Sequence, residues 1–153
     1  MDKKVRLGII GVGNMGSGHL GNVMDGKCPD IVIAAVADQL GINEEQAFGF
    51  AGAFGGGLHV GEVCGAATGA AMAIGLRYGQ LYPDDVAAKA QCGAVIGQFM
   101  DEFKRREGAV CCRDLLGYNP RNPEEKAKYG ERNKTICPKA IATALKILEE
   151  MGI

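Results

Sequence analysis

The pattern of apolar and polar positions divides the chain into two parts. Short apolar runs at residues 5–10 and 31–38 flank a glycine-rich stretch, followed by a helix expected from Ser17 to about Met24. The first run is typical of a β-strand. The run 31–38 is either a buried parallel strand or a buried helix, because periodicity cannot separate the two over so few residues.

Beyond Gly41 the pattern becomes helical. Helices are predicted from Asn43 to about Ala53, from Gly61 to Tyr78, from Pro83 to about Glu107, over 112–116 and from Cys137 onward. Their ends carry the expected signals: Asn43 and Gln46 form a capping box, and Gly79 and Gly108 end helices. A flexible loop is expected over 54–57 and a polar, surface-exposed stretch over 117–132.

Apolar residues at helical spacing indicate the buried faces. The helix after Pro83 is predicted to bury Val86, Ala90, Gly93, Ile96 with Gly97, Met100 and Phe103, and the last helix Ile141, Leu145, Leu148 and Met151. The fold predicted is therefore mainly α, a compact helical bundle, with a short βαβ Rossmann-like piece at the N-terminus. Residues 1–38 would form that fragment, and residues 39–153 the helical cysteine domain.

Composition and charge exclude several function classes. The chain has 153 residues, of which 47% are apolar, and a net charge of −1, so no strong field is available to bind nucleic acid or an anionic membrane. The basic run Lys104-Arg105-Arg106 suits the C-terminal end of a helix. No apolar run is long enough to span a bilayer, and no signal peptide is evident, so we expect a cytoplasmic location. Homo-oligomerisation stays open.

The N-terminal stretch carries a dinucleotide-binding pattern. Gly11-x-Gly13-x-x-Gly16 lies between an expected strand and helix, and Asp38 ends the next apolar run. Residues 3–38 resemble the start of the Gfo/Idh/MocA oxidoreductases, which implies NAD(P) binding by Gly11, Gly13, Gly16 and Asp38. Nothing after Asp38 predicts further strands, and one βαβ unit cannot close a cofactor crevice. NAD(P) is therefore not the expected cofactor, and an NAD(P)-binding fragment remains an alternative.

The six cysteines are the main candidates for chemistry. In the cytoplasm, cysteines are more often reduced, metal-bound or catalytic than joined in structural disulfides. Cys64 is predicted in the first turn of a helix, where backbone amides lower a thiol pKa. Cys28 and Cys137 each precede a proline, which places them at helix N-caps by the same reasoning.

The remaining candidates carry weaker signals. No CxxC pair occurs, so a zinc ribbon is unsupported. Only one of the adjacent pair Cys111 and Cys112 can easily face inward, and Cys92 is expected to be a small buried apolar residue. His59 is either a base or ligand near Cys64 or a solvent-exposed loop residue. Glu62 is interpreted as a carboxylate in the first turn of a helix.

Residues from about 26 to 151 resemble the C_GCAxxG_C_C (CGAxxG) family of redox-active proteins. The matching pieces are Gly26-Lys27-Cys28, Leu40-Gly41-Ile42, Phe54-Gly55-Gly56-Gly57, Gly61-Glu62-Val63-Cys64-Gly65-Ala66-x-x-Gly69, Gly75-Leu76-x-Tyr78-Gly79, Cys112-Arg113-Asp114-Leu115-Leu116-Gly117 and Cys137-Pro138. The resemblance implies an α-helical domain with four characteristic cysteines that carry out redox chemistry. Matched by motif, these are Cys64, Cys112, Cys137 and Cys28.

The leading hypothesis is a redox protein whose thiols converge at helix N-termini. Cys28, Cys64, Cys112 and Cys137 would either exchange thiols with disulfides or hold an iron–sulfur or other metal centre, with a redox partner that the sequence does not identify. Two alternatives stay open: the NAD(P)-binding oxidoreductase fragment, and a non-catalytic helical domain, natural or engineered as a hybrid, whose cysteines only fill space.

Overall fold

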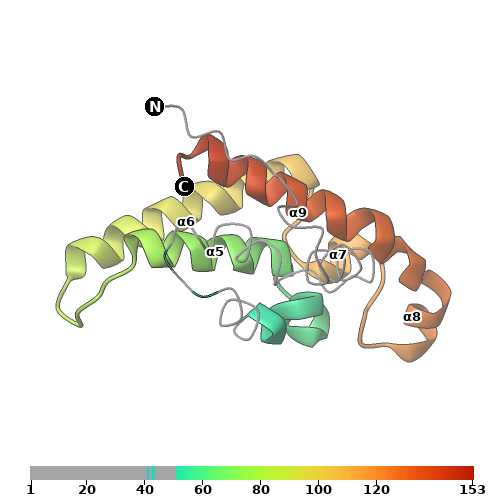
Figure 1. Cartoon of the computed structure of the whole chain (residues 1–153). Helices are drawn as coiled ribbons and strands as arrows, with labels where there is room; N and C mark the ends of the chain where they lie inside the picture. Colours follow the sequence, from blue (N-terminus) through green and yellow to red (C-terminus); the bar gives the residue numbers. More distant parts are fainter. Residues whose placement is uncertain (1–40, 42, 44–50) are drawn as a thin grey trace.

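The computed structural model describes residues 41, 43 and 51–153. Five expectations therefore lie outside the described residues: the strand at 5–10, the helix after Ser17, the segment 31–38, the fragment 1–38, and most of the helix from Asn43 to Ala53. The described part is built from helices, as predicted (Figure 1). In chain order these are η1 (Gly52–Phe54), η2 (Gly57–Gly61), α5 (Gly65–Tyr78), α6 (Val86–Glu107), α7 (Cys112–Leu116), α8 (Pro123–Tyr129), η3 (Gly130–Arg132) and α9 (Asn133–Glu150).

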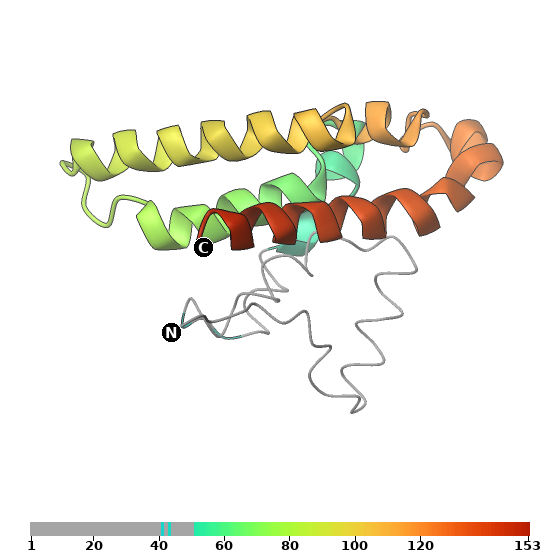
Figure 2. The same cartoon turned by 90° about the horizontal axis from the view of Figure 1, so that it is seen from above.

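Three long helices form the body of the domain. α5 and α6 make an antiparallel pair joined by residues 79–85, and α9 packs against both of them (Figure 2). The largest fully buried side chains come from all three helices: Ile74, Phe99, Phe103, Ile147 and Leu148. The core therefore lies between these helices.

Small residues let α5 approach its neighbours closely. Gly65, Ala66, Ala67, Gly69, Ala70 and Ala73 are all buried on this helix. Ala67, Ala70 and Ala73 have no exposed surface at all. A helix with so little side-chain volume on its buried face can pack near another backbone, and this brings the start of α5 close to α6 and α9.

α6 begins later than predicted and buries less of its surface. It starts at Val86 rather than at Pro83, because the Asp85 carboxylate accepts a hydrogen bond of 3.0 Å from the Ala88 amide and caps the helix there. The predicted stripe is wrong in the N-terminal half, where Ala90, Gly93 and Gly97 are exposed and Val86 is 73% exposed. Burial is confined to the half that α9 covers, around Phe99 and Phe103.

α9 begins at Asn133, four residues before the predicted start at Cys137. The short helix η3 continues into it without a break, so the chain is already helical when it reaches Asn133. Cys137 and Pro138 therefore lie inside the helix, and Cys137 is not an N-cap. Three of the four predicted core positions are confirmed, since Ile141, Leu145 and Leu148 are buried. The fourth, Met151, follows the end of α9 and is only partly buried.

Three smaller predictions have mixed outcomes. The helix expected from Gly61 ends at Tyr78 as predicted but begins at Gly65, because Gly61 ends η2, Val63 forms a bridge and Cys64 is the N-cap. The loop expected over 54–57 is partly helical, since η1 ends at Phe54 and η2 begins at Gly57. The stretch 117–132 is mostly at the surface, as predicted, but it contains α8 and the buried Tyr118.

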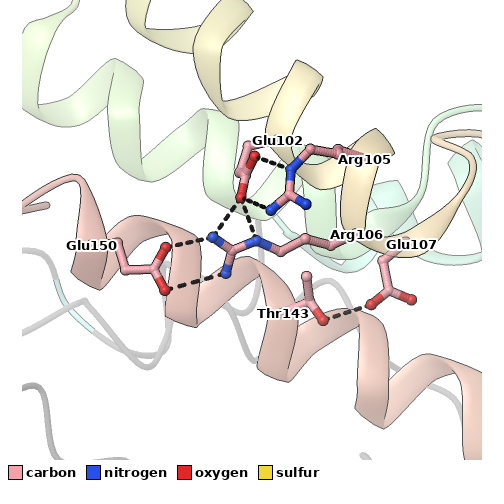
Figure 3. Close-up of polar contacts among 6 residues, drawn as sticks. All are labelled: Glu102, Arg105, Arg106, Glu107, Thr143 and Glu150. Carbon is pink, nitrogen blue, oxygen red and sulfur yellow. Dashed lines mark hydrogen bonds and ion pairs between the residues drawn. The ribbon is translucent and has the colours of Figure 1, made fainter.

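Polar contacts join the end of α6 to α9 (Figure 3). The predicted basic run does close α6, and Arg106 bonds both Glu102 and Glu150, the latter at 2.5 Å. Beside it, the Glu107 carboxylate accepts a hydrogen bond of 2.6 Å from the Thr143 hydroxyl and lies 3.2 Å from the Lys139 ammonium. Within the described part of the chain, no helix has the length and apolarity needed to cross a membrane.

Candidate thiol site

A single antiparallel bridge brings two distant cysteines together. Val63 pairs with Cys111, and this pairing is flanked by hydrogen bonds from the Cys64 amide to the Val110 carbonyl (2.9 Å) and from the Cys112 amide to the Glu62 carbonyl (2.6 Å). Cys64 and Cys112 are consequently diagonal neighbours across the bridge, a relation in which side chains remain within reach of each other. The bridge forms where α5 begins and α7 begins.

Cys64 is the N-cap of α5, and its side chain is 9% exposed. The expectation that the helix end would lower its pKa is wrong for this environment. Burial raises the pKa of the Cys64 thiol, and this outweighs the opposing effect of the Ala66 and Ala67 amides. Negative charge on Cys137 or Glu107 would raise that pKa further, so both groups lie within electrostatic range of the Cys64 sulfur.

Cys112 is the first residue of α7 and is 5% exposed. Burial, followed by the neighbouring thiols of Cys64, Cys137 and Cys111, raises its pKa to about 12. The side chain packs in a small apolar cluster with Leu116 and Tyr118. Cys112 is therefore a neutral thiol at physiological pH, and the apolar side chains of Leu116 and Tyr118 pack beside it.

Cys137 reaches the same place from α9. It is partly buried and packs against both the main core cluster and the apolar cluster around Cys112. Negative charge on Cys137 would raise the pKa of both Cys64 and Cys112, so Cys137 lies within electrostatic range of the other two sulfurs. Cys137 thus packs against the clusters that contain Cys64 and Cys112, whereas the predicted N-cap position holds for Cys64 alone.

The other described candidates are less buried than Cys64 and Cys112. Cys111 is partly exposed while Cys112 is buried, as expected for adjacent residues, and Cys92 packs against the core from α6. His59 is exposed, and Glu62 lies outside the helix, where its carboxylate pairs with Arg113. Cys28, Gly11, Gly13, Gly16 and Asp38 lie outside the described residues.

The five described cysteines are not joined in disulfides. The described residues also contain no group of three or more histidine, cysteine, aspartate or glutamate side chains arranged to hold a metal ion. The three thiols share a region without forming a ready-made metal cage.

Two residues near the thiols were missed by the sequence reasoning. Tyr118 is 4% exposed and donates a hydrogen bond of 2.7 Å from its hydroxyl to Asn133 Oδ1. Burial raises its pKa, and charge on Cys112 or Cys137 acts in the same direction. Glu107, whose side chain is 4% exposed, is the second. The only sequence signal for Tyr118 was an aromatic residue within a polar stretch. Glu107 gave no signal, because a glutamate at the end of a helix is not unusual.

Comparison with known proteins gives one result. A protein-family model described as "Putative redox-active protein (C_GCAxxG_C_C)" matches residues 27–151. Searches of curated proteins and of solved structures each returned no match. The resemblance of residues 3–38 to the Gfo/Idh/MocA oxidoreductases gains no support from any of these comparisons.

Proposed function

Because the chain belongs to the C_GCAxxG_C_C family of redox-active proteins, we propose that it transfers electrons by thiol–disulfide exchange at Cys64, Cys112 and Cys137. The observation that carries this proposal is the meeting of three thiols from α5, α7 and α9 in one buried region. The substrate is a compound or protein that contains a disulfide.

Cys64 is the attacking thiol in this proposal. It has the Ala66 and Ala67 amides beside it, which stabilise a thiolate, whereas the causes that act on Cys112 all oppose ionisation. The thiolate is the nucleophile in exchange, so the sulfur with these amides is the better candidate. The charge of Glu107 opposes ionisation of Cys64, and relief of that charge would favour the reaction.

The exchange proceeds in two balanced steps. The Cys64 thiolate attacks one sulfur of the substrate disulfide, which forms a mixed disulfide and releases the other substrate sulfur as a thiolate. The Cys112 or Cys137 thiolate then attacks the Cys64 sulfur, which forms a disulfide within the protein and releases the second substrate thiolate. Two electrons pass from the protein dithiol to the substrate, and the two protein protons end on the two substrate thiols.

A metal centre is the second use of the same cysteines, and it would need Cys28 in addition. The described residues favour the thiol route because they provide no group of three or more ligands placed for a metal. Metal analysis of protein prepared without oxygen distinguishes the two. Iron or zinc in a fixed ratio to protein, lost on Cys64→Ser, would replace the exchange proposal with a metal one.

The test is thiol counting combined with peptide mapping. Fully reduced protein should present six thiols to a thiol reagent after denaturation, because the sequence has six cysteines. After treatment with a small disulfide such as oxidised glutathione, we expect two fewer. Mapping should find a disulfide from Cys64 to Cys112 or Cys137.

Single serine variants provide the controls. Cys64→Ser should abolish the exchange, while Cys92→Ser should leave it unchanged, because Cys92 packs against the core from the middle of α6. Cys111→Ser is the closer control, since it alters a cysteine adjacent to Cys112 that remains partly exposed. Retention of all six thiols under oxidation, or a disulfide that always includes Cys92, would exclude the proposal.

A further inference from the structure

We propose that residues 56–60, here called the cover turn, form a strained gate over Cys112 that must open before this thiol can react. The inference rests on the proposed function for its purpose, since a gate matters only if Cys112 reacts. Its evidence is separate, because it comes from the backbone of the turn and from the contacts that the turn makes.

The cover turn lies directly against Cys112. A Cβ atom built on Gly57 would lie 2.8 Å from the Cys112 Cβ and 2.4 Å from the Glu62 carbonyl oxygen. The Glu62 amide also donates a hydrogen bond of 3.0 Å to the Gly57 carbonyl, which ties the turn to the bridge that holds both cysteines. Only glycine permits this approach, so bare backbone of the turn lies against the Cys112 side chain.

The backbone of the turn is held in a conformation that ordinary residues avoid. Gly56, Gly57, Leu58 and His59 are consecutive residues with φ between 58° and 64°. Glycine adopts this left-handed region freely, but Leu58 and His59 have side chains that do not fit it well. Strain of this kind persists where surrounding contacts impose it, and such sites are common at switches and ligand clamps.

The remaining surroundings of Cys112 are better anchored. Leu116 and Tyr118 are buried beside it, and the Tyr118 hydroxyl is bonded to Asn133 on α9. In contrast, Leu58 is 45% exposed and Val60 is 37% exposed, so little apolar burial holds the cover turn in place. Among the described segments that contact Cys112, the cover turn combines a strained backbone with exposed apolar side chains. It is therefore the segment that we expect to move away from Cys112.

Two glycines in the turn provide a matched pair of variants. Gly56 and Gly57 have similar φ angles, but a Cβ on Gly56 meets nothing within 4 Å, whereas a Cβ on Gly57 collides with Glu62 and Cys112. Gly56→Ala and Gly57→Ala therefore add the same kind of backbone strain. Only Gly57→Ala pushes the turn away from the thiol.

The measurement is the rate at which N-ethylmaleimide labels Cys112 in the reduced full chain. Trypsin releases residues 107–113 as one peptide, and fragment spectra assign the label to Cys111 or Cys112. Cys111 is partly exposed and serves as the internal reference. We expect Gly57→Ala to raise the Cys112 rate roughly 5- to 30-fold above that of Gly56→Ala, the effect of one or two kcal/mol on a local opening equilibrium.

A variant that relieves strain should act in the opposite direction. Asparagine tolerates left-handed backbone, so Leu58→Asn should keep the turn closed and label Cys112 more slowly than the wild type. This variant keeps the test decisive if Gly57→Ala unfolds the protein, which parallel labelling of Cys92 and Cys112 would reveal. Equal Cys112 rates in two folded glycine variants, or a Leu58→Asn rate at or above that of the wild type, would overturn the proposal.

The outcome does not depend on the exchange reaction. Labelling requires only that the thiol become accessible, so a cover can be present in a protein that transfers no electrons. If oxidation leaves all six thiols intact while Gly57→Ala still exposes Cys112, the proposed function fails and the cover stands. If a disulfide forms normally and the two glycine variants label alike, the cover fails and the function stands.

Discussion

The raised pKa of Cys112 predicts a specific loss of stability at alkaline pH. A thiol whose pKa is 9.0 in the unfolded chain and about 12 in the folded protein keeps its proton longer in the folded state. Between these values the unfolded chain has lost its proton and the folded one has not. Ionisation therefore favours unfolding, and the contribution of Cys112 to stability falls as pH rises from about 9 towards 12.

The size of this effect follows from the two pKa values. At pH 10.5, ionisation of one such thiol in the unfolded state costs about 2 kcal/mol of folding free energy, whereas at pH 8 the cost is about 0.1 kcal/mol. Replacing Cys112 by alanine removes this titration and leaves the other groups to titrate largely as before. The wild type should therefore lose about 2 kcal/mol more than Cys112→Ala between these pH values.

The assay is urea unfolding of both proteins at pH 8.0 and pH 10.5 in the presence of a phosphine reductant. For each protein, the free energy of unfolding at pH 10.5 is subtracted from its value at pH 8.0. The stability that Cys112→Ala loses through poorer packing is the same at both pH values and therefore cancels. The absorbance of thiolate near 240 nm gives a second readout at pH 10.5. On unfolding, the wild type should gain one thiolate more than Cys112→Ala, because Cys112 ionises only in the unfolded chain. Equal losses of stability in the two proteins, within about 0.5 kcal/mol, would refute burial as the cause of the raised pKa.

Three further predictions concern the frame around the thiols. Glu107→Gln should lower the free energy of unfolding by about 1–2 kcal/mol in urea unfolding, because the Thr143 hydroxyl loses a charged acceptor. The same variant should speed alkylation of Cys64 at pH 8.5 in a labelling assay, because it removes a charge that opposes the thiolate. Pro138→Ala should raise the melting temperature, because proline inside a helix costs up to about 3 kcal/mol. Phe103→Ala, at a site with no exposed surface, should cost about 3–5 kcal/mol in urea unfolding.

The sequence was most informative where a local signal decides the structure. Gly79 and Gly108 follow the ends of α5 and α6, as predicted, and the boundaries of α7 were correct. Only Gly108 adopts the left-handed conformation, with φ of 86°, whereas Gly79 is extended. The family predicted from the cysteine motif is confirmed by the family model that matches residues 27–151. Helix ends and motifs depend on neighbouring residues, which is why they can be predicted from a single chain.

Errors arose where tertiary contacts override local preference. A proline usually marks the beginning of a helix, yet Pro138 lies in the interior of α9. The helix has already begun at η3, and burial of the apolar face of α9 offsets the cost of the proline. Val86 belongs to a helical apolar stripe but is 73% exposed, because α9 covers only the other half of α6. Neither outcome is visible in the periodicity of the segment itself.

The reactivity of Cys64 is set by two opposing effects of one location. The end of α5 presents amides that stabilise a thiolate, and the junction of helices that creates this end also buries the sulfur, which disfavours the charge. In the folded protein the effect of burial is the larger of the two, so the pKa of the Cys64 thiol is raised. Entry of water or substrate would remove the desolvation while leaving the amides in place. The same sulfur would then become the stronger nucleophile, so access to the thiol region also controls its acidity.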